Sequence, residues 1–153
     1  MDNRDRMFDE KVVELKRVSR TVKGGRRISF RALVIVGDRK GRVGLGVSKA
    51  NDVSQAIKKA TSRAKKLLFD IRLNEANSVK KEVYGVFGAS KVLLKPAPEG
   101  TSIISGGVVR TVAELAGIRN LVGKSIGSSN KINLAKATIH GLLEASKDDD
   151  NSK

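Results

Sequence analysis

The chain has 153 residues, enough for one medium-sized domain or two small ones, and 39% of them are hydrophobic, which suffices for packed cores. Lysine and arginine total 31 against 16 acidic residues, a net charge of +15, and such an excess attracts polyanions such as nucleic acids. Aromatic residues are only 3% and cysteine is absent, which excludes base stacking as the main mode of nucleic-acid contact and excludes disulfides and thiolate metal sites.

The positive charge is concentrated in the first half of the chain. Residues 1–75 carry 20 basic and 9 acidic groups (+11), and residues 76–153 carry 11 and 7 (+4), so phosphate contacts are expected mainly in the first half. The first ten residues lack the apolar segment of a signal peptide. The longest apolar run, Ala32 to Val36, is too short to span a bilayer. A cytoplasmic protein without a membrane partner is expected.

Three strands are predicted near the start of the chain. The stretch from Val12 to Val22 is rich in β-branched residues and predicts the first. A turn follows at Lys23-Gly24-Gly25, since glycine tolerates positive φ. Residues 26–36 alternate and then become apolar on both sides, which predicts a second strand covered on both faces at its end. After a turn over residues 37–41, residues 43–47 predict a third strand whose glycines let another element approach closely.

A basic amphipathic helix is predicted after the third strand. Asn51 or Asp52 is the expected N-cap, and apolar residues recur at helical spacing up to Leu67 and Leu68. Lysine and arginine occupy most of the remaining surface of this helix. Residues 74–78 are polar and the hydrophobic pattern changes after them, which predicts a linker.

The second half predicts four short strands and two helices. The strands are expected over residues 81–87, 91–94, 102–105 and 121–126. A helix is predicted over residues 108–116, and Gly117 is a suitable residue to end it. Asn130 is the expected cap of a last helix that continues to Leu143.

These elements divide into two α+β domains, over residues 11–73 and 79–146. In the second domain, the helices are expected on one face of a mixed sheet. The charged residues 1–10 predict a flexible N-terminal tail, and residues 147–153 predict a disordered acidic tail.

The turn at residues 23–25 is the most distinctive local feature. Its two glycines expose backbone N–H groups and are flanked by cations. Such a hairpin tip can enter a groove and bind phosphates, and the charge of the whole chain favours this interpretation over a solvated turn. The candidate RNA-binding residues of the first half are Arg20, Thr21, Lys23, Gly24, Gly25, Arg26, Arg27 and Arg31, with Lys58 and Arg63 on the basic face of the predicted helix.

A polar cluster lies before and inside the last predicted helix. Hydroxyls and amides near a helix N-terminus suit phosphate binding, but plain helix capping accounts for them equally well. Both interpretations stay open. The candidate RNA-binding residues here are Lys124, Ser125, Ser128, Asn130, Asn133 and Lys136.

Two features that look like catalytic or cofactor motifs are better explained as structural. The stretch from Gly41 to Gly46 has its glycines in the wrong order and context for a dinucleotide fingerprint. His140 is the only histidine, so a metal site would lack partners at the required spacing. No catalytic residue, metal or cofactor is predicted, and the chain is not expected to be an enzyme.

Three blocks of sequence resemble the family of bacterial small-subunit ribosomal protein five. They are VSRTVKGGRRISFRALVIVGDRKGRVGLGVSKA (residues 18–50), PAPEGTSIISGG (residues 96–107) and GSSNKINLAKATIHGL (residues 127–142). The resemblance implies an N-terminal double-stranded-RNA-binding-like β-β-β-α domain, in agreement with the elements predicted above. It also implies a C-terminal mixed-sheet domain that contains a βαβ unit.

The resemblance further implies a structural constituent of the small ribosomal subunit. Such a protein binds small-subunit rRNA and contributes to subunit assembly, decoding accuracy and the mRNA entry channel. The implied partners are ribosomal proteins four and eight and mRNA near the entry channel. The hairpin tip, residues 21–26, maps to the family's spectinomycin-associated loop, and Arg110 is the candidate interface with protein four.

Two other classes compete with this interpretation. A small-molecule kinase is an alternative because kinases share the fold implied for the second domain, but the chain lacks a phosphate-cradling loop and a carboxylate pair for Mg²⁺. A free-standing RNA or DNA chaperone fits the composition, but the three blocks argue against it.

Overall fold

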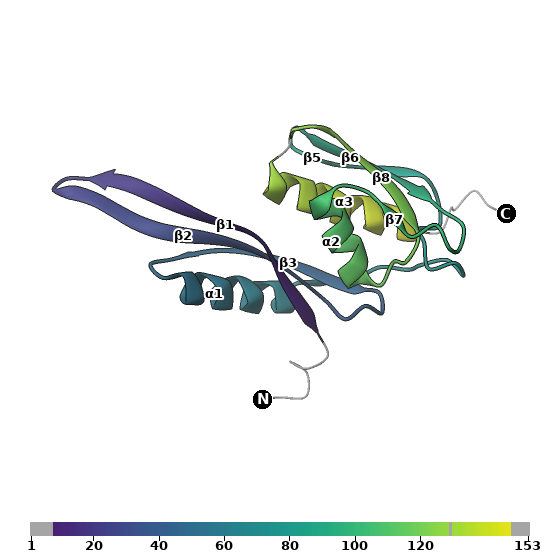
Figure 1. Ribbon diagram of the computed structural model, residues 1–153, viewed down its shortest axis with the longest axis horizontal. Coiled ribbons are helices and arrows are strands. Elements are labelled where there is room, and N and C mark those ends of the chain that lie inside the picture. Colours follow the sequence, from purple (N-terminus) through teal and green to yellow (C-terminus); the bar gives the residue numbers. More distant parts are fainter. Residues whose placement is uncertain (1–7, 129, 148–153) are drawn as a thin grey trace.

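The chain folds into four stacked layers. The computed structural model describes residues 8–128 and 130–147, which form two four-stranded sheets and three helices. One helix covers the outer side of the first sheet, and the other two helices lie between the first sheet and the second (Figure 1). Among these described helices, none is long and apolar enough to cross a membrane.

The first sheet is antiparallel, in the order β1-β2-β3-β4. Its elements are β1 (Asp9–Val22), β2 (Gly25–Gly37), β3 (Arg42–Ala50), α1 (Val53–Lys66) and β4 (Leu68–Asp70). The three predicted strands and the helix are therefore confirmed. One boundary differs: Asp9 pairs with Gly37, so the last two residues of the tail expected over residues 1–10 belong to the sheet. The rest of that tail, residues 1–7, and residues 148–153 of the expected acidic tail lie outside the described ranges.

Strand β4 is missing from the sequence-based prediction, which extends the helix to Leu67 and Leu68. The spacing of these leucines continues the apolar stripe of α1, but the helix ends at Lys66 and Leu67 is 60% exposed. Leu68 instead pairs with Gly44 of β3. This pairing satisfies backbone groups that an uncovered strand edge would leave open. The prediction is wrong for these two residues.

Small residues let α1 lie close against the sheet. The residues that it buries are Ala56, Ala60 and Ala64, each one turn from the next. A Cβ atom at Gly44 or Gly46 would collide with the backbone of this helix. The glycines of β3 therefore allow a close approach, as predicted, and the approaching element is α1.

The second sheet is mixed, in the order β5-β6-β8-β7. Its elements are β5 (Val83–Phe87), β6 (Ser90–Pro96), β7 (Ile103–Ile104), α2 (Gly107–Ala116), β8 (Leu121–Gly127) and α3 (Lys131–Ser146). β7 and β8 are parallel and are connected through α2, which forms the βαβ unit that the resemblance implies. Both helices cover one face of this sheet, as predicted (Figure 1). Gly117 ends α2 with a φ of 93°, and Asn130 caps α3.

Backbone hydrogen bonds join the two halves of the molecule. The turn between β2 and β3 donates from the Arg39 N–H to the Leu115 carbonyl (3.0 Å) and from the Gly41 N–H to the Ala116 carbonyl (2.9 Å). These carbonyls belong to the last turn of α2, where helical partners are lacking. The first sheet therefore caps a helix of the second half.

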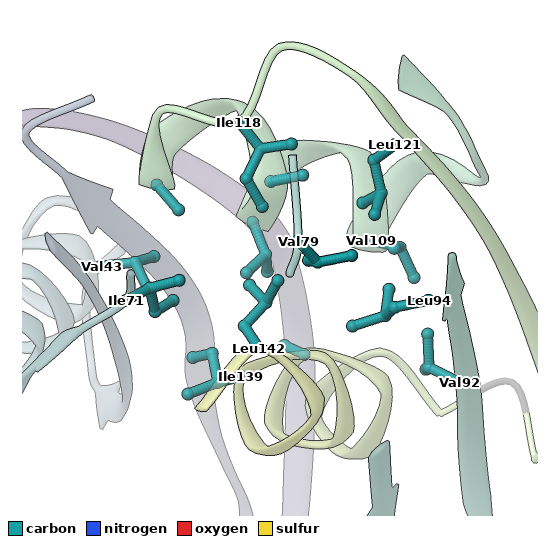
Figure 2. Packing of buried hydrophobic residues seen from close by; sticks show 14 of the residues in the cluster. Val43, Ile71, Val79, Val92, Leu94, Val109, Ile118, Leu121, Ile139 and Leu142 are labelled. Carbon is teal, nitrogen blue, oxygen red and sulfur yellow. The ribbon is translucent and has the colours of Figure 1, made fainter. Parts of the chain in front are cut away.

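A single hydrophobic core extends across this junction. Val43 of β3 belongs to the same buried cluster as Leu142 of α3 (Figure 2). A smaller cluster lies between the first sheet and α1. Ile35 belongs to the larger cluster, whereas Val34 and Val36 belong to the smaller one, so β2 is covered on both faces, as predicted.

The connection over residues 74–78 is held by hydrogen bonds. The Asn74 side chain accepts from the N–H groups of Ala76 and Ser78. The Asn120 side chain donates to the Ala76 carbonyl at 2.7 Å. The predicted linker is thus tied to the second half of the chain through Asn120.

Gly37→Ala should destabilise the whole molecule, because a Cβ atom at this position would collide with the carbonyl of Leu115. Overpacking of this kind costs about 1–3 kcal/mol, and each kcal/mol lowers the Tm of a chain of this size by roughly 2–4 °C. Thermal unfolding followed by circular dichroism measures the effect. Gly107→Ala is the matched control, since a Cβ atom there meets nothing within 4 Å and alanine favours a helix. Equal Tm values for the two variants would contradict the close packing of the turn on α2.

Candidate nucleic-acid interface

The hairpin of β1 and β2 extends beyond the rest of the first sheet (Figure 1). β3 pairs with β2 only from Phe30 onward, so residues 18–22 and 25–29 form a two-stranded ribbon. At about 3.3 Å per residue, this ribbon is roughly 16 Å long. The turn residues are Lys23 and Gly24, and both Gly24 and Gly25 have positive φ (106° and 149°). The glycine turn predicted from the sequence is therefore present at the tip.

Cations lie directly opposite one another across this hairpin. Arg20 pairs with Arg27, and Lys16 pairs with Arg31; Arg31 is also opposite Lys49 of β3. Side chains alternate along a strand, so these five cations share one face. We call them the basic row. Like charges directly opposite each other destabilise a sheet, whereas the phosphates of a nucleic acid would relieve the repulsion.

Glu14 contacts the basic row at its base. Its Oε1 atom accepts from Nη2 of Arg31 at 3.1 Å, and the two side chains are 23% and 27% exposed, respectively. Glu14 lies opposite Leu33, next to a β-bulge that begins at Val12. It therefore reaches Arg31 diagonally across the strands and orients the guanidinium at the point where the free ribbon joins the sheet.

The basic row continues into a groove at the edge of β3. β4 covers this strand only from Arg42 to Gly44, and a cavity of about 430 Å³ opens further along, beside α1. Nη1 of Arg63 donates to the Val47 carbonyl at 2.9 Å, which satisfies an edge carbonyl and holds the guanidinium there. We call this cavity the basic groove; its lining residues are Arg31, Val47, Ser48, Lys49, Lys59 and Arg63. Four cations around one opening suit the binding of phosphates.

The structure groups many of the residues predicted in the first half. Arg20, Arg27, Arg31 and Arg63 belong to the basic row or the basic groove. Thr21 and Arg26 form the pair next to them on the other face of the hairpin, and Lys23, Gly24 and Gly25 form the tip. Lys58 is exposed on α1, outside the lining of the groove.

Sequence reasoning missed three cations of this surface. Lys16 and Lys49 become candidates only once the strand register places both opposite Arg31. Lys59 precedes Arg63 by four residues, and this spacing puts both on one side of a helix. That helical spacing is visible in the sequence and could have identified Lys59.

The polar cluster predicted around the last helix is divided by the second sheet. Lys124 lies on the face of β8 that points away from the helices, and its neighbour Ser125 lies on the helix side. The Asn130 side chain accepts from the N–H groups of Ile132 and Asn133, so helix capping accounts for this residue.

The other members of that cluster have varied surroundings. Oγ of Ser128 accepts from the Asn130 N–H at 3.3 Å, and the amide of Asn133 lies near Gly88. Nζ of Lys136 lies 4.8 Å from the centre of the Phe87 ring. For all six residues of the cluster, RNA binding stays a prediction.

Arg110 lies in the first turn of α2. Its Nε atom is 2.9 Å from Oε1 of Glu114, and its side chain is 56% exposed. A partner can therefore reach it. Its assignment to an interface stays a prediction.

The glycines of residues 41–46 and the histidine have roles in packing. Gly44 and Gly46 lie under α1, where a dinucleotide could not approach them. The ring of His140 packs edge-to-face on Phe87, with centroids 5.6 Å apart, and its Nδ1 atom is 3.4 Å from the Val86 carbonyl. Within residues 8–128 and 130–147, no three His, Cys, Asp or Glu side chains are grouped so as to hold a metal ion.

Two protein-family models match the chain in order. The model described as Ribosomal protein S5, N-terminal domain, matches residues 8–72. The model described as Ribosomal protein S5, C-terminal domain, matches residues 85–152. Together they cover all three helices and both sheets of the described structure, except the first two residues of β5, which confirms the two-part α+β architecture.

Individual relatives carry matching names. The chain is 48% identical over 139 residues to the small ribosomal subunit protein uS5 of Acaryochloris marina, covering 91% of this chain and 78% of that protein. It is 52% identical over 135 residues to uS5 of Gloeobacter violaceus (88% and 60%) and 46% identical over 135 residues to uS5c of Cyanophora paradoxa (88% and 80%). Because the matching models and relatives are ribosomal proteins, which are structural components, the prediction that the chain is not an enzyme is confirmed. The chain therefore belongs to the ribosomal protein S5 family.

Proposed function

We propose that this protein is a structural constituent of the small ribosomal subunit, in the cytoplasm, and that it binds small-subunit rRNA through the basic row and the basic groove. The observation that carries the proposal is the pairing of Arg20 with Arg27 and of Lys16 with Arg31. In the free protein these pairs cost stability. Bound phosphates offset that cost, so the arrangement favours the RNA-bound state. The names of the relatives support a place in the small subunit.

The two surfaces have different roles in this binding. The ribbon is narrow and exposed at both edges, so it reaches between RNA helices while the sheet stays outside. The basic groove is concave, and Arg63 is held at its wall by the hydrogen bond to Val47. The groove therefore holds the sugar-phosphate backbone of a neighbouring RNA strand. Both contact phosphates, and the shape of the RNA sets the register, as is usual for helical RNA.

The proposal extends to neighbours within the particle. The chain contributes to subunit assembly, decoding accuracy and the mRNA entry channel, with ribosomal proteins four and eight and mRNA as partners. Arg110 lies at the interface with protein four. Its exposure and its position at the start of α2 support this placement.

The protein should sediment with the small ribosomal subunit when a cell lysate is fractionated. Many phosphate contacts acting together should keep it bound at moderate salt. The distribution of the protein across a sucrose gradient, at low and then higher salt, provides the measurement. Migration as a free monomer at low salt would refute the proposed function and favour a free-standing RNA chaperone.

Arg20→Gln combined with Arg27→Gln should weaken binding to small-subunit rRNA and reduce its dependence on salt. Each lost phosphate contact lowers the slope of log K against log[salt] by roughly 0.7–0.9, so the double variant should lose about 1.4–1.8. Fluorescence anisotropy of the full chain with rRNA, at a series of KCl concentrations, gives the slope.

The matched control for this measurement is Arg39→Gln combined with Arg42→Gln. It removes the same charge from exposed side chains that pair with Asp9 and Asp70. These arginines lie at the opposite end of the first sheet from the hairpin tip. If both double variants change the slope equally, the hairpin has no special role in phosphate binding.

Arg110→Ala should change the frequency of misreading, because it alters the proposed interface with protein four. A stop-codon readthrough reporter measures this in cells whose only copy of the protein is the variant. Lys147→Ala is the control, since Lys147 is another exposed cation in an ion pair, with Glu144 of α3. Unchanged readthrough for Arg110→Ala would remove this residue from the accuracy interface.

A further inference from the structure

The second sheet presents one face to solvent. Helices α2 and α3 cover its other face, and the sheet is one of the two outer layers of the molecule, with α1 at the opposite side (Figure 1). Side chains alternate along each strand, so every second residue of β5, β6, β7 and β8 belongs to this uncovered face, which we call the outer face. Its apolar members are Tyr84, Val86, Leu93, Ile104, Val122 and Ile126.

The outer face is unusually apolar for an exposed surface. Ile104, Val86, Tyr84 and Ile126 are 56%, 52%, 51% and 43% exposed. They are half of the eight large hydrophobic residues that are exposed in the described part of the chain, and the sheet gathers them on one side. Exposed apolar residues that gather on one face indicate an interaction site, whereas exposed apolar residues scattered singly do not.

Lysines are interleaved with these apolar side chains. The register places Lys91 between Val86 and Ile126. In the adjoining rows, Lys124 lies opposite Leu93, and Lys95 lies opposite Val122. No acidic residue occurs in the four strands. The outer face is therefore both apolar and positively charged.

We propose that the outer face docks a protein partner whose own surface presents aliphatic side chains flanked by aspartate and glutamate. The proposal rests on the proposed function only in assuming that the chain works inside an assembly. Aliphatic contacts supply the buried area, and carboxylates of the partner meet the three lysines. This charge complementarity sets the orientation of the partner and excludes basic proteins. Lys124, a candidate for RNA binding by sequence, is then part of a protein interface.

An RNA partner fits this face poorly. Binding of single strands on a sheet uses several exposed rings, but Tyr84 is the only ring on the outer face. Nζ of Lys91 lies 4.4 Å from the centre of that ring, so the ring is already engaged. The cations of the outer face are also spaced among aliphatic groups, unlike the directly opposed pairs of the basic row.

A second copy of this chain fits poorly as well. A symmetric contact between two outer faces would bring the same three lysines together from both sides. The net charge of +15 adds to the repulsion. The observations therefore favour a different protein with acidic groups.

The test begins with a photo-crosslinking amino acid at Ile104 or Ile126 in the full chain, expressed in growing cells. The products are purified from the lysate by way of this chain, whether or not it is bound to small subunits, and analysed by mass spectrometry. The expected result is a crosslink to a protein segment that contains both aliphatic and acidic side chains. Crosslinks to RNA, to a second copy of this chain or to a basic segment, or no crosslink at all, would each overturn the proposal.

Charge variants then test the chemistry. Lys91→Glu combined with Lys95→Glu should weaken binding of the crosslinked partner by about tenfold or more. Changing the crosslinked carboxylates of the partner to lysine should restore it. Leu67→Asp is a control that places a negative charge on an exposed apolar residue outside the outer face, and circular dichroism confirms that each variant is folded. Loss without rescue would overturn the role of the carboxylates.

The two proposals can fail separately. If the unsubstituted protein sediments with the small subunit but its outer face crosslinks to RNA, the docking proposal is wrong and the proposed function stands. If the protein is absent from the subunit but the outer face binds an acidic protein with the expected charge rescue, the reverse holds.

Discussion

The cap that the β2–β3 turn places on α2 determines how the rest of the molecule is arranged. Two N–H groups, of Arg39 and Gly41, meet the carbonyls of Leu115 and Ala116 that end this helix. A helix terminus buried without partners would be costly, so neither half can leave the other without exposing these groups. The shared core below the turn adds apolar burial to the same junction (Figure 2). The cap and the shared core together fix the direction of the hairpin relative to the second sheet.

Small residues at helix crossings compensate for the scarcity of large side chains. Gly44 and Gly46 admit α1 to the first sheet, and Gly85 and Gly141 meet where α3 crosses β5. A chain with 3% aromatic residues cannot fill wide gaps between layers. It instead brings backbones close together, so that alanine and valine suffice for dense packing. Both sheets solve the packing problem in the same way, although one is antiparallel and the other is mixed.

Local patterns predicted most elements, and long-range register explains what they missed. β-Branched residues identified β1, and alternation and glycine turns identified β2 and β3. Asn130 and Gly117 marked helix ends. All of these signals act within a few residues. Leu68 was misassigned because its spacing also fits a helix, and only its pairing with Gly44 of β3 shows that it belongs to a strand. Lys16 and Lys49 were missed because no local pattern places them opposite Arg31. Lys124 and Ser125 were grouped as neighbours in sequence, but a strand points them to opposite sides.

The junction between the halves also bears on the order in which the chain can fold during synthesis. The first sheet and α1 leave the ribosome early, but Ile35 and Val43 are buried only when α2 and α3 arrive. Until then, one face of a nearly complete sheet stays open to water, and the turn at Arg39 has no helix end to bind. The nascent N-terminal half is therefore an intermediate that exposes hydrophobic surface and is prone to aggregation. It waits for the translation of residues 107–146, and a pause before that point would prolong its exposure to aggregation and to chaperones.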